Sequence, residues 1–117
     1  MNEPTPAGGS AHIEVLENTA DRFYELRVDG ESAGLMVYEL AGSRRIFTHT
    51  FIKEGYGGRG LSKRLMRDAL DDLRAQHLKV TVLCPILEGF IAANPEYEVV
   101  IDPDHPGSWA RHTPPGG

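Results

Sequence analysis

The chain has 117 residues, of which 40% are hydrophobic and 25% charged, a composition typical of one globular domain. Its 12 Lys and Arg against 17 Asp and Glu give a formal net charge of -5, the wrong sign for a protein held to nucleic acid by phosphate neutralisation. The chain has a single cysteine, no signal-peptide pattern after Met1 and no run near the roughly 20 apolar residues of a membrane span, so we expect a cytoplasmic protein without a disulfide, a metal site or a membrane segment.

Both ends of the chain are rich in Pro and Gly. Segments of this composition bury too little apolar surface to offset the entropy lost on folding. We therefore expect flexible segments at residues 1–11 and 102–117, on either side of one domain at residues 12–101.

The first half of this domain alternates between hydrophobic and polar residues, which is the period of a half-buried strand. Turn-forming residues separate the alternating stretches, and each gap is short enough for an antiparallel hairpin. The pattern predicts a four-stranded meander, with strands at residues 13–16, 23–28, 33–40 and 45–52.

The second half begins with a helical period. Apolar residues recur every three or four positions from Leu61 to Leu73, which predicts an amphipathic helix. A buried strand at residues 78–84 ends before Pro85, which opens a short helix to Ala93, and a last strand is expected at 97–101. The predicted fold class is α/β (α+β) with a mixed, mostly antiparallel sheet, in the order β-β-β-β-α-β-α-β.

A glycine-rich loop, Gly55-Tyr56-Gly57-Gly58-Arg59-Gly60, joins the fourth predicted strand to the first helix. Glycine lets the backbone take positive φ and approach a ligand, while the free amides and the dipole at the start of a helix attract an anion. Between Lys53 and Arg67, five basic residues stand against one acid, Glu54, so the local charge is +4 in an acidic chain. Neither the P-loop nor the dinucleotide-binding pattern is present, and we predict a site for a small polyanion such as a pyrophosphate.

Around this loop the sequence resembles the GNAT acetyltransferase superfamily. The central motif of that superfamily, Gln/Arg-x-x-Gly-x-Gly/Ala, is matched in part by Gly58-Arg59-Gly60. Further along, Leu83-Cys84-Pro85 and Asn94-Pro95-Glu96-Tyr97 resemble a subgroup of very short, single-domain GNAT-like proteins with a Leu-Cys-Pro segment. The resemblance extends over residues 31–97.

The resemblance implies an acetyl-coenzyme A (acetyl-CoA) cleft between the strands at 45–52 and 78–84, and an N-acyltransferase that moves an acetyl group to an amine. Backbone groups of Thr50, Phe51 and Ile52 would face the pantetheine arm. The amides facing the pyrophosphate would be those of Gly57, Gly58, Arg59, Gly60, Leu61 and Ser62. The acceptor would be a small-molecule or peptide amine, and the sequence specifies neither this amine nor the oligomeric state.

Two side chains are candidates for moving protons in such a reaction. His49 lies on the strand before the loop, with Phe47 and Phe51 expected on the same face, and its imidazole suits a general base. Cys84 ends the strand beside the thioester, where a thiol donates a proton or accepts the acyl group transiently. If the two strands are neighbours, Cys84 and His49 form a hydrogen-bonded pair. The alternative for each residue is a role in packing.

Three positions depart from the family pattern and define a rival hypothesis. Gly55 and Gly57 stand where longer side chains are usual, and Phe90 stands where many members have a tyrosine that protonates the thiolate. Tyr97 is a weaker substitute for that tyrosine. The rival is a module that binds CoA or acyl-CoA without turnover, and a third alternative is an interaction domain that keeps only the scaffold.

Overall fold

A computed structural model describes residues 12–112 of the chain. The expected flexible segment at residues 1–11 and the last five residues of the expected tail lie outside the described residues. Within residues 12–112, none of the helices is long and apolar enough to cross a membrane.

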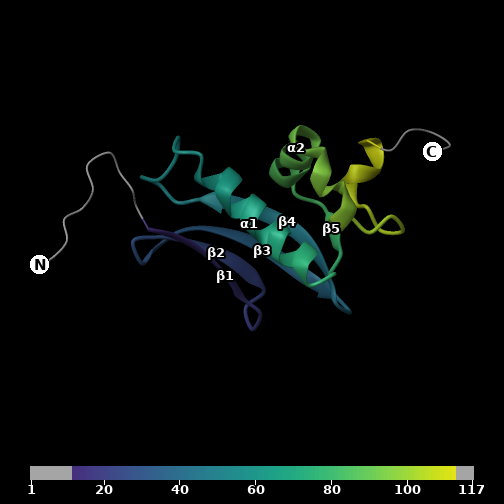
Figure 1. Ribbon diagram of the computed structural model, residues 1–117, viewed down its shortest axis with the longest axis horizontal. Helices are drawn as coiled ribbons and strands as arrows, with labels where there is room; N and C mark the ends of the chain where they lie inside the picture. The colour runs from purple at the N-terminus through teal and green to yellow at the C-terminus, as the bar shows by residue number, and fades with distance from the viewer. Residues whose placement is uncertain (1–11, 113–117) are drawn as a thin grey trace, which may run out of the picture.

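The domain is built on one five-stranded sheet in the order β1-β2-β3-β4-β5. Its first four strands form the predicted antiparallel meander, and β5 pairs in parallel with β4. The strands are β1 (Ile13–Asn18), β2 (Phe23–Val28), β3 (Glu31–Ala41), β4 (Arg44–Ile52) and β5 (Val80–Val82). Figure 1 shows the meander and, beside one end of β4, the short strand β5.

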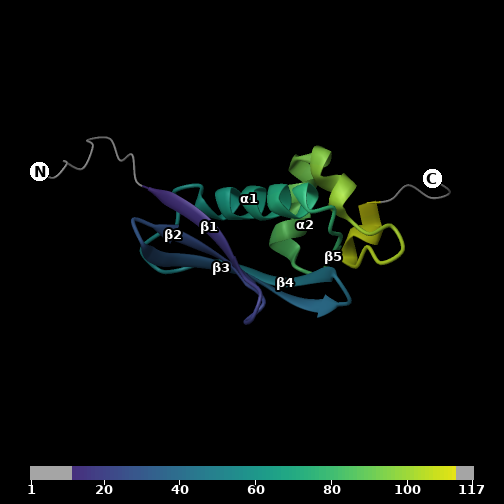
Figure 2. The same cartoon turned by 60° about the horizontal axis from the view of Figure 1, so that its bottom comes forward.

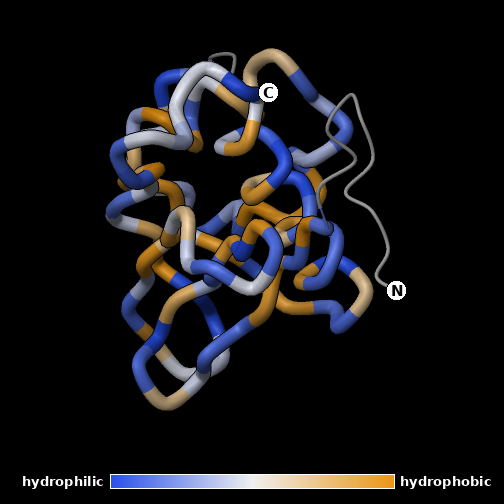
Figure 3. The backbone as a smooth tube through the Cα atoms, turned by 90° about the vertical axis from the view of Figure 1, so that its left-hand side faces the viewer, coloured by the Kyte–Doolittle hydropathy of each residue, from blue (hydrophilic) through white to orange (hydrophobic). Residues whose placement is uncertain are grey.

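The turn between β2 and β3 explains why this hairpin forms so tightly. Its two residues, Asp29 and Gly30, both have positive φ, 52° and 84°. Positive φ at both positions matches the right-handed twist of the flanking strands, and Asp-Gly is a favoured pair for such a turn. Along the backbone, hydrophobic and hydrophilic residues alternate over short distances (Figure 3).

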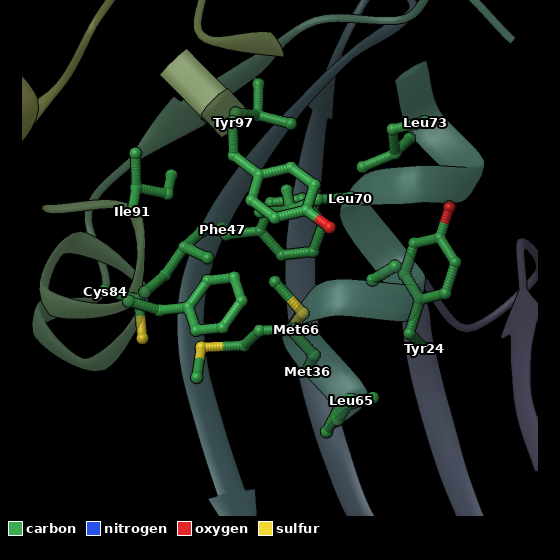
Figure 4. Close-up of a cluster of buried hydrophobic side chains, with 14 of the residues drawn as sticks. Tyr24, Met36, Phe47, Leu65, Met66, Leu70, Leu73, Cys84, Ile91 and Tyr97 are labelled. Atoms are coloured by element: carbon green, nitrogen blue, oxygen red, sulfur yellow. The ribbon is translucent and has the colours of Figure 1, made fainter. Parts of the chain in front are cut away.

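Helix α1 (Leu61–Ala75) lies along one face of the sheet and supplies the predicted apolar stripe to the core. Figure 2 shows it above the strands, and Figure 4 shows Met66 and Leu70 of the helix next to Phe47 of β4. All three of these side chains are buried. On the opposite face of the sheet, Phe51 and Leu16 remain 44% and 41% exposed.

The chain after β5 forms α2 (Pro85–Ala93) and then two 3₁₀ helices, η1 (Pro95–Val100) and η2 (Ser108–His112). The strand expected at residues 97–101 is therefore wrong, and of these five residues only Ile101 forms a bridge to the sheet, with Val80. Tyr97 and Val100 are both buried, and this spacing of three residues fits one side of a 3₁₀ helix better than the alternation of a strand.

Residues 102–112 were expected in a flexible tail, and the structure corrects this expectation. Trp109 is only 6% exposed, and Gly107 bridges Val82 at the free edge of β5. Gly107 has φ 68°, and a Cβ there would collide with the carbonyl of Val82. The Gly and Pro residues of this segment thus let the chain pack closely along the edge of the sheet. Their composition alone indicates disorder.

Candidate functional site

The pairing of β4 with β5 ends halfway along β4. Register runs from Arg45 opposite Val80 to Phe47 opposite Val82, and the last bond is donated by the Leu83 amide to the Phe47 carbonyl at 2.9 Å. The chain then turns into α2, while β4 continues to Ile52. From residue 48 onward, β4 therefore has no strand on its β5 side within the described part of the chain, and the two strands form a split.

A β-bulge at Thr48 sets which side chains face the core beside this split. Tyr38 of β3 pairs with Phe47, whereas the preceding Val37 pairs with His49, so Thr48 is an extra residue on β4. Phe47 and Thr50 are consequently buried, and His49 is exposed. The expectation that His49 shares a face with Phe47 is wrong, because the extra residue changes the phase of the alternation between them.

Cys84 lies at the junction between β5 and α2, where it is the N-cap residue of the helix. It is 2% exposed, and its thiol donates a hydrogen bond to Thr50 Oγ1 at 3.4 Å. His49 instead has Nδ1 3.2 Å from Thr48 Oγ1. The expected Cys84–His49 hydrogen bond is absent from this geometry, and the side chain of Thr50, which sequence reasoning considered only for its backbone, takes the place of His49.

The glycine-rich loop leads directly into α1, and no side chain caps the first turn of this helix. Gly58 and Gly60 have φ values of 76° and 71°, which favour glycine, and Gly60 is the N-cap residue with no side-chain hydrogen bond. The first bond within the helix is donated by the Arg64 amide to the Gly60 carbonyl, at 3.2 Å. The preceding amides of the first turn are thus free for an anion among the described residues, and no acidic residue occupies this turn.

The basic residues near this helix end differ in their surroundings. Arg59 lies over the ring of Tyr56, with 5.8 Å to its centroid, and Arg64 forms an ion pair with Asp68 at 2.7 Å. Lys63 and Arg67 line a groove of about 490 Å³ between α1 and α2. These two side chains place positive charge along the wall of that groove.

The groove lies between the first two turns of α1 and the length of α2. Gly89 faces open space, because a Cβ at this position would meet no atom within 4 Å. Its position inside a helix, where glycine is unfavourable, is the signal that sequence reasoning missed. The lining residues are Ser62, Lys63, Met66, Arg67, Ile86, Gly89, Phe90, Ala93 and Asn94.

No tyrosine lines this groove. Phe90 lies on the wall of the groove and has no hydroxyl. Tyr97 packs beside it, with ring centroids 5.7 Å apart, but its hydroxyl donates to Asp71 Oδ1 at 2.8 Å. Burial, followed by this hydrogen bond, raises the pKa of Tyr97 to about 12. The described residues also contain no group of three or more His, Cys, Asp or Glu side chains placed to hold a metal ion.

The mixed sheet, the split beside β4 and the uncapped helix define a GNAT-like α/β protein. A family model described as GCN5-related N-acetyl-transferase matches residues 23–100, and the chain belongs to this family. The chain is 31% identical to protein NATD1 of Bos taurus over 85 residues, which are 71% of this chain and 75% of the relative. Over the same length it is 29% identical to protein NATD1 of Gallus gallus, covering 71% of this chain and 77% of the relative, and 29% identical to protein NATD1 of Homo sapiens, covering 71% and 75%.

Proposed function

We propose that the chain binds acetyl-CoA along the split and the groove. The observation that carries this proposal is the unpaired edge of β4, which leads from the split to the uncapped start of α1. Backbone groups of Thr50, Phe51 and Ile52 would hold the pantetheine arm along this edge. The pyrophosphate would meet the amides of Gly57, Gly58, Arg59, Gly60, Leu61 and Ser62.

The charges of the site support a polyanionic ligand. The helix end contributes partial positive charge, and Lys63 and Arg67 contribute full charges on the same groove. Lys63 and Arg67 are exposed, and neither forms an ion pair among the described residues. An extended ligand with phosphates at one end and an uncharged arm at the other fits this distribution.

The reaction we propose is transfer of the acetyl group to an amine. The amine nitrogen attacks the thioester carbon, a C–N bond forms, the C–S bond breaks, and the CoA thiolate leaves. The amine loses one proton in this exchange and the thiolate gains one. The protein must therefore accept a proton on the acceptor side and supply one near the sulfur.

His49 and Cys84 occupy different sides of the split and suit different halves of this exchange. Cys84 is buried at the junction with α2, where its thiol would supply the proton to the leaving thiolate. His49 is exposed on the sheet face that α1 leaves uncovered, where its ring would take the proton of an incoming amine. The two residues act separately in this proposal, because Thr50 holds the thiol.

A CoA-binding module without turnover is the second candidate function. It is favoured by one observation, that the groove carries Phe90 and no phenol, while the hydroxyl of Tyr97 is engaged by Asp71. Binding and turnover therefore need separate measurements.

The binding test is calorimetry with acetyl-CoA on the wild-type protein, Gly58→Glu and Gly42→Glu. Gly58 and Gly42 both have positive φ and open space around the Cβ position, so the two substitutions impose similar backbone strain and the same charge. Only Gly58 lies in the loop, and we expect Gly58→Glu to weaken binding at least about tenfold through repulsion of the pyrophosphate. Equal affinities for Gly58→Glu and Gly42→Glu, or no binding by the wild type, would remove the proposed site.

Turnover is tested by following thiol release from acetyl-CoA with a panel of small amines and peptides with free amino groups. Release that depends on the amine supports the transferase. Tight binding with no release across the panel favours the binding module.

A further inference from the structure

The carboxylate of Glu88 on α2 is surrounded by donors from the C-terminal 3₁₀ helix. Ser108 Oγ lies 2.7 Å from Glu88 Oε1, and Arg111 Nη2 lies 2.9 and 2.8 Å from Oε1 and Oε2. His112 Nε2 lies 2.7 Å from Oε2. Glu88 is only 8% exposed. We call this group of four residues the Glu88 clasp.

The same segment also holds β5. Ser108 Oγ lies 3.1 Å from the Val82 carbonyl, so its single proton is shared between Val82 and the nearer Glu88. The Val82 amide donates to the Pro106 carbonyl at 3.3 Å, and Gly107 bridges Val82. Figure 1 shows η2 beside both α2 and β5. The segment therefore fastens the strand before Cys84 to the helix after it.

The clasp and the groove lie on different sides of α2. Gly89 and Phe90 line the groove, whereas Glu88 is turned from Phe90 by roughly 200° around the helix axis. The groove is an open space between α2 and α1. The clasp supplies directional hydrogen bonds on the other side, and all four of its contacts end on the charged carboxylate of Glu88, at 2.7 to 2.9 Å.

The partners of Glu88 lie outside the part of the chain that the family model covers. That match ends at residue 100, and Ser108, Arg111 and His112 come after it. The match therefore says nothing of how α2 is held in this chain.

We propose that Glu88 is a positioning residue for the acyl-CoA site. Through the clasp it holds α2 against β5, and this fixes the width of the groove and the place of the Cys84 junction beside the split. The proposal rests on the proposed function, because it concerns the same site.

The fluorescence emission of Trp109 reports on the clasp without any CoA. It is the only tryptophan of the chain, it is 6% exposed, and its ring stacks on His112 with centroids 4.1 Å apart. It is not among the lining residues of the groove. A shift in its emission in a clasp variant therefore reports a change at the clasp itself.

The experiment compares the wild type with Glu88→Gln, Arg111→Met, the double variant and the control Glu98→Gln, whose exposed carboxylate lies on η1. Calorimetry gives the Kd for CoA, and Trp109 emission is recorded with and without CoA. We expect each clasp variant to shift the emission of the free protein and raise the Kd about tenfold. The double variant should raise it no further than the larger single change, because both residues act through one contact. Glu98→Gln should match the wild type in Kd and emission.

Circular dichroism shows whether each variant folds. Ser108→Ala replaces any that does not, because it removes only the hydroxyl shared between Glu88 and Val82 and leaves the ion pair with Arg111. A clasp variant with shifted Trp109 emission and an unchanged Kd overturns the positioning role, as does an unshifted emission with an unchanged Kd. If the wild type binds no CoA, the proposed function fails and the positioning role with it. An emission shift in Glu88→Gln would then identify the clasp as a purely structural contact.

Discussion

The Cys84 thiol lies 3.4 Å from Thr50 Oγ1, and this contact joins the two sides of the β4–β5 split at its buried end. Both residues are nearly inaccessible, at 2% and 5% exposed. The contact links the first residue of the α2 junction to β4 beyond the last backbone pairing of the two strands. Among the described residues, it is the only side-chain hydrogen bond across the split.

Removing the acceptor tests this contact. Thr50→Val keeps the shape of the side chain and removes the hydroxyl, so it should lower the free energy of unfolding by about 1 kcal/mol, the usual value of a buried hydrogen bond. Urea denaturation measures the change. Cys84→Ser is the companion variant, because the serine hydroxyl still donates a hydrogen bond to Thr50. In the otherwise wild-type chain, Cys84→Ser should therefore lower the free energy of unfolding by less than Thr50→Val does. A loss for Thr50→Val that persists equally in a Cys84→Ala background would show that the bond is not its cause.

A second prediction concerns His49, which the bulge at Thr48 turns to solvent. Because the ring is exposed, His49→Ala should change the free energy of unfolding by no more than about 0.5 kcal/mol. If His49 accepts the proton of the amine, the same variant should slow acetyl transfer by about 10²–10⁴-fold and leave the Kd for acetyl-CoA unchanged. His105→Ala, at another exposed histidine, is the control for both measurements. Full transfer activity in His49→Ala would exclude its role as the base.

The sequence predicts those parts of the fold that follow from short-range patterns. The four strands of the meander, the stripe of α1 and the start of α2 at Pro85 are local, and the structure confirms each of them. The bulge at Thr48 is different, because the same alternating letters fit β4 with or without an extra residue, and only the register with β3 decides. One inserted residue was enough to place His49 on the face opposite to Phe47.

The two wrong expectations for the C-terminal segment, a strand at residues 97–101 and a flexible tail from residue 102, have a related cause. Glu88 meets its partners 20 to 24 residues further along the chain, and no periodicity connects residues at such separations. The Pro and Gly content that indicates a flexible tail is also what a chain needs to pass closely along β5 at Gly107. Long-range pairing decided the structure of this segment, and it left no local signal.

The third prediction is the pH dependence of stability that the Glu88 clasp confers. Hydrogen bonds from Ser108, then His112, then Arg111 lower the pKa of Glu88 from 4.5 to about 2 in the folded protein. A carboxyl group with a lowered folded pKa stabilises the protein above its unfolded pKa, and this stability is lost as the pH falls through the folded value. The contribution of Glu88 should thus be complete above pH 4.5 and disappear between about pH 4.5 and 2.

Urea denaturation from pH 2 to 6 measures this effect. The difference in unfolding free energy between the wild type and Glu88→Gln should be constant above pH 5 and shrink as the pH approaches 2, since the wild-type carboxyl group becomes neutral like the amide. Glu98→Gln should run parallel to the wild type over the whole range. A difference that stays constant down to pH 2 would contradict the lowered pKa.

Gly107 gives the fourth prediction. Gly107→Ala and Gly42→Ala both place a Cβ at positive φ, which costs about 1–2 kcal/mol in each case. At Gly107 the Cβ also collides with the Val82 carbonyl, and overpacking of this kind costs about 1–3 kcal/mol more. Gly107→Ala should accordingly have the lower thermal midpoint and should expose Trp109, seen as a red shift of its emission. Equal midpoints for the two variants would mean that residues 102–112 are not packed against β5.

Gly89 gives the last prediction, because it separates the groove from the stability of the helix that forms its wall. Its Cβ position is open, so Gly89→Ala should stabilise α2 by about 0.5–1 kcal/mol, as expected for replacing glycine inside a helix. Gly89→Leu places a large side chain in the same open space, between Phe90 and the residues of α1 that line the groove. It should keep most of that stability and yet weaken acetyl-CoA binding by at least about tenfold, which calorimetry measures. Ala92→Leu, at an exposed position of α2 outside the groove lining, is the matched control and should bind as the wild type does. If Gly89→Leu is stably folded and binds acetyl-CoA with unchanged affinity, the ligand does not use this groove, and only the split and the loop amides remain as its site.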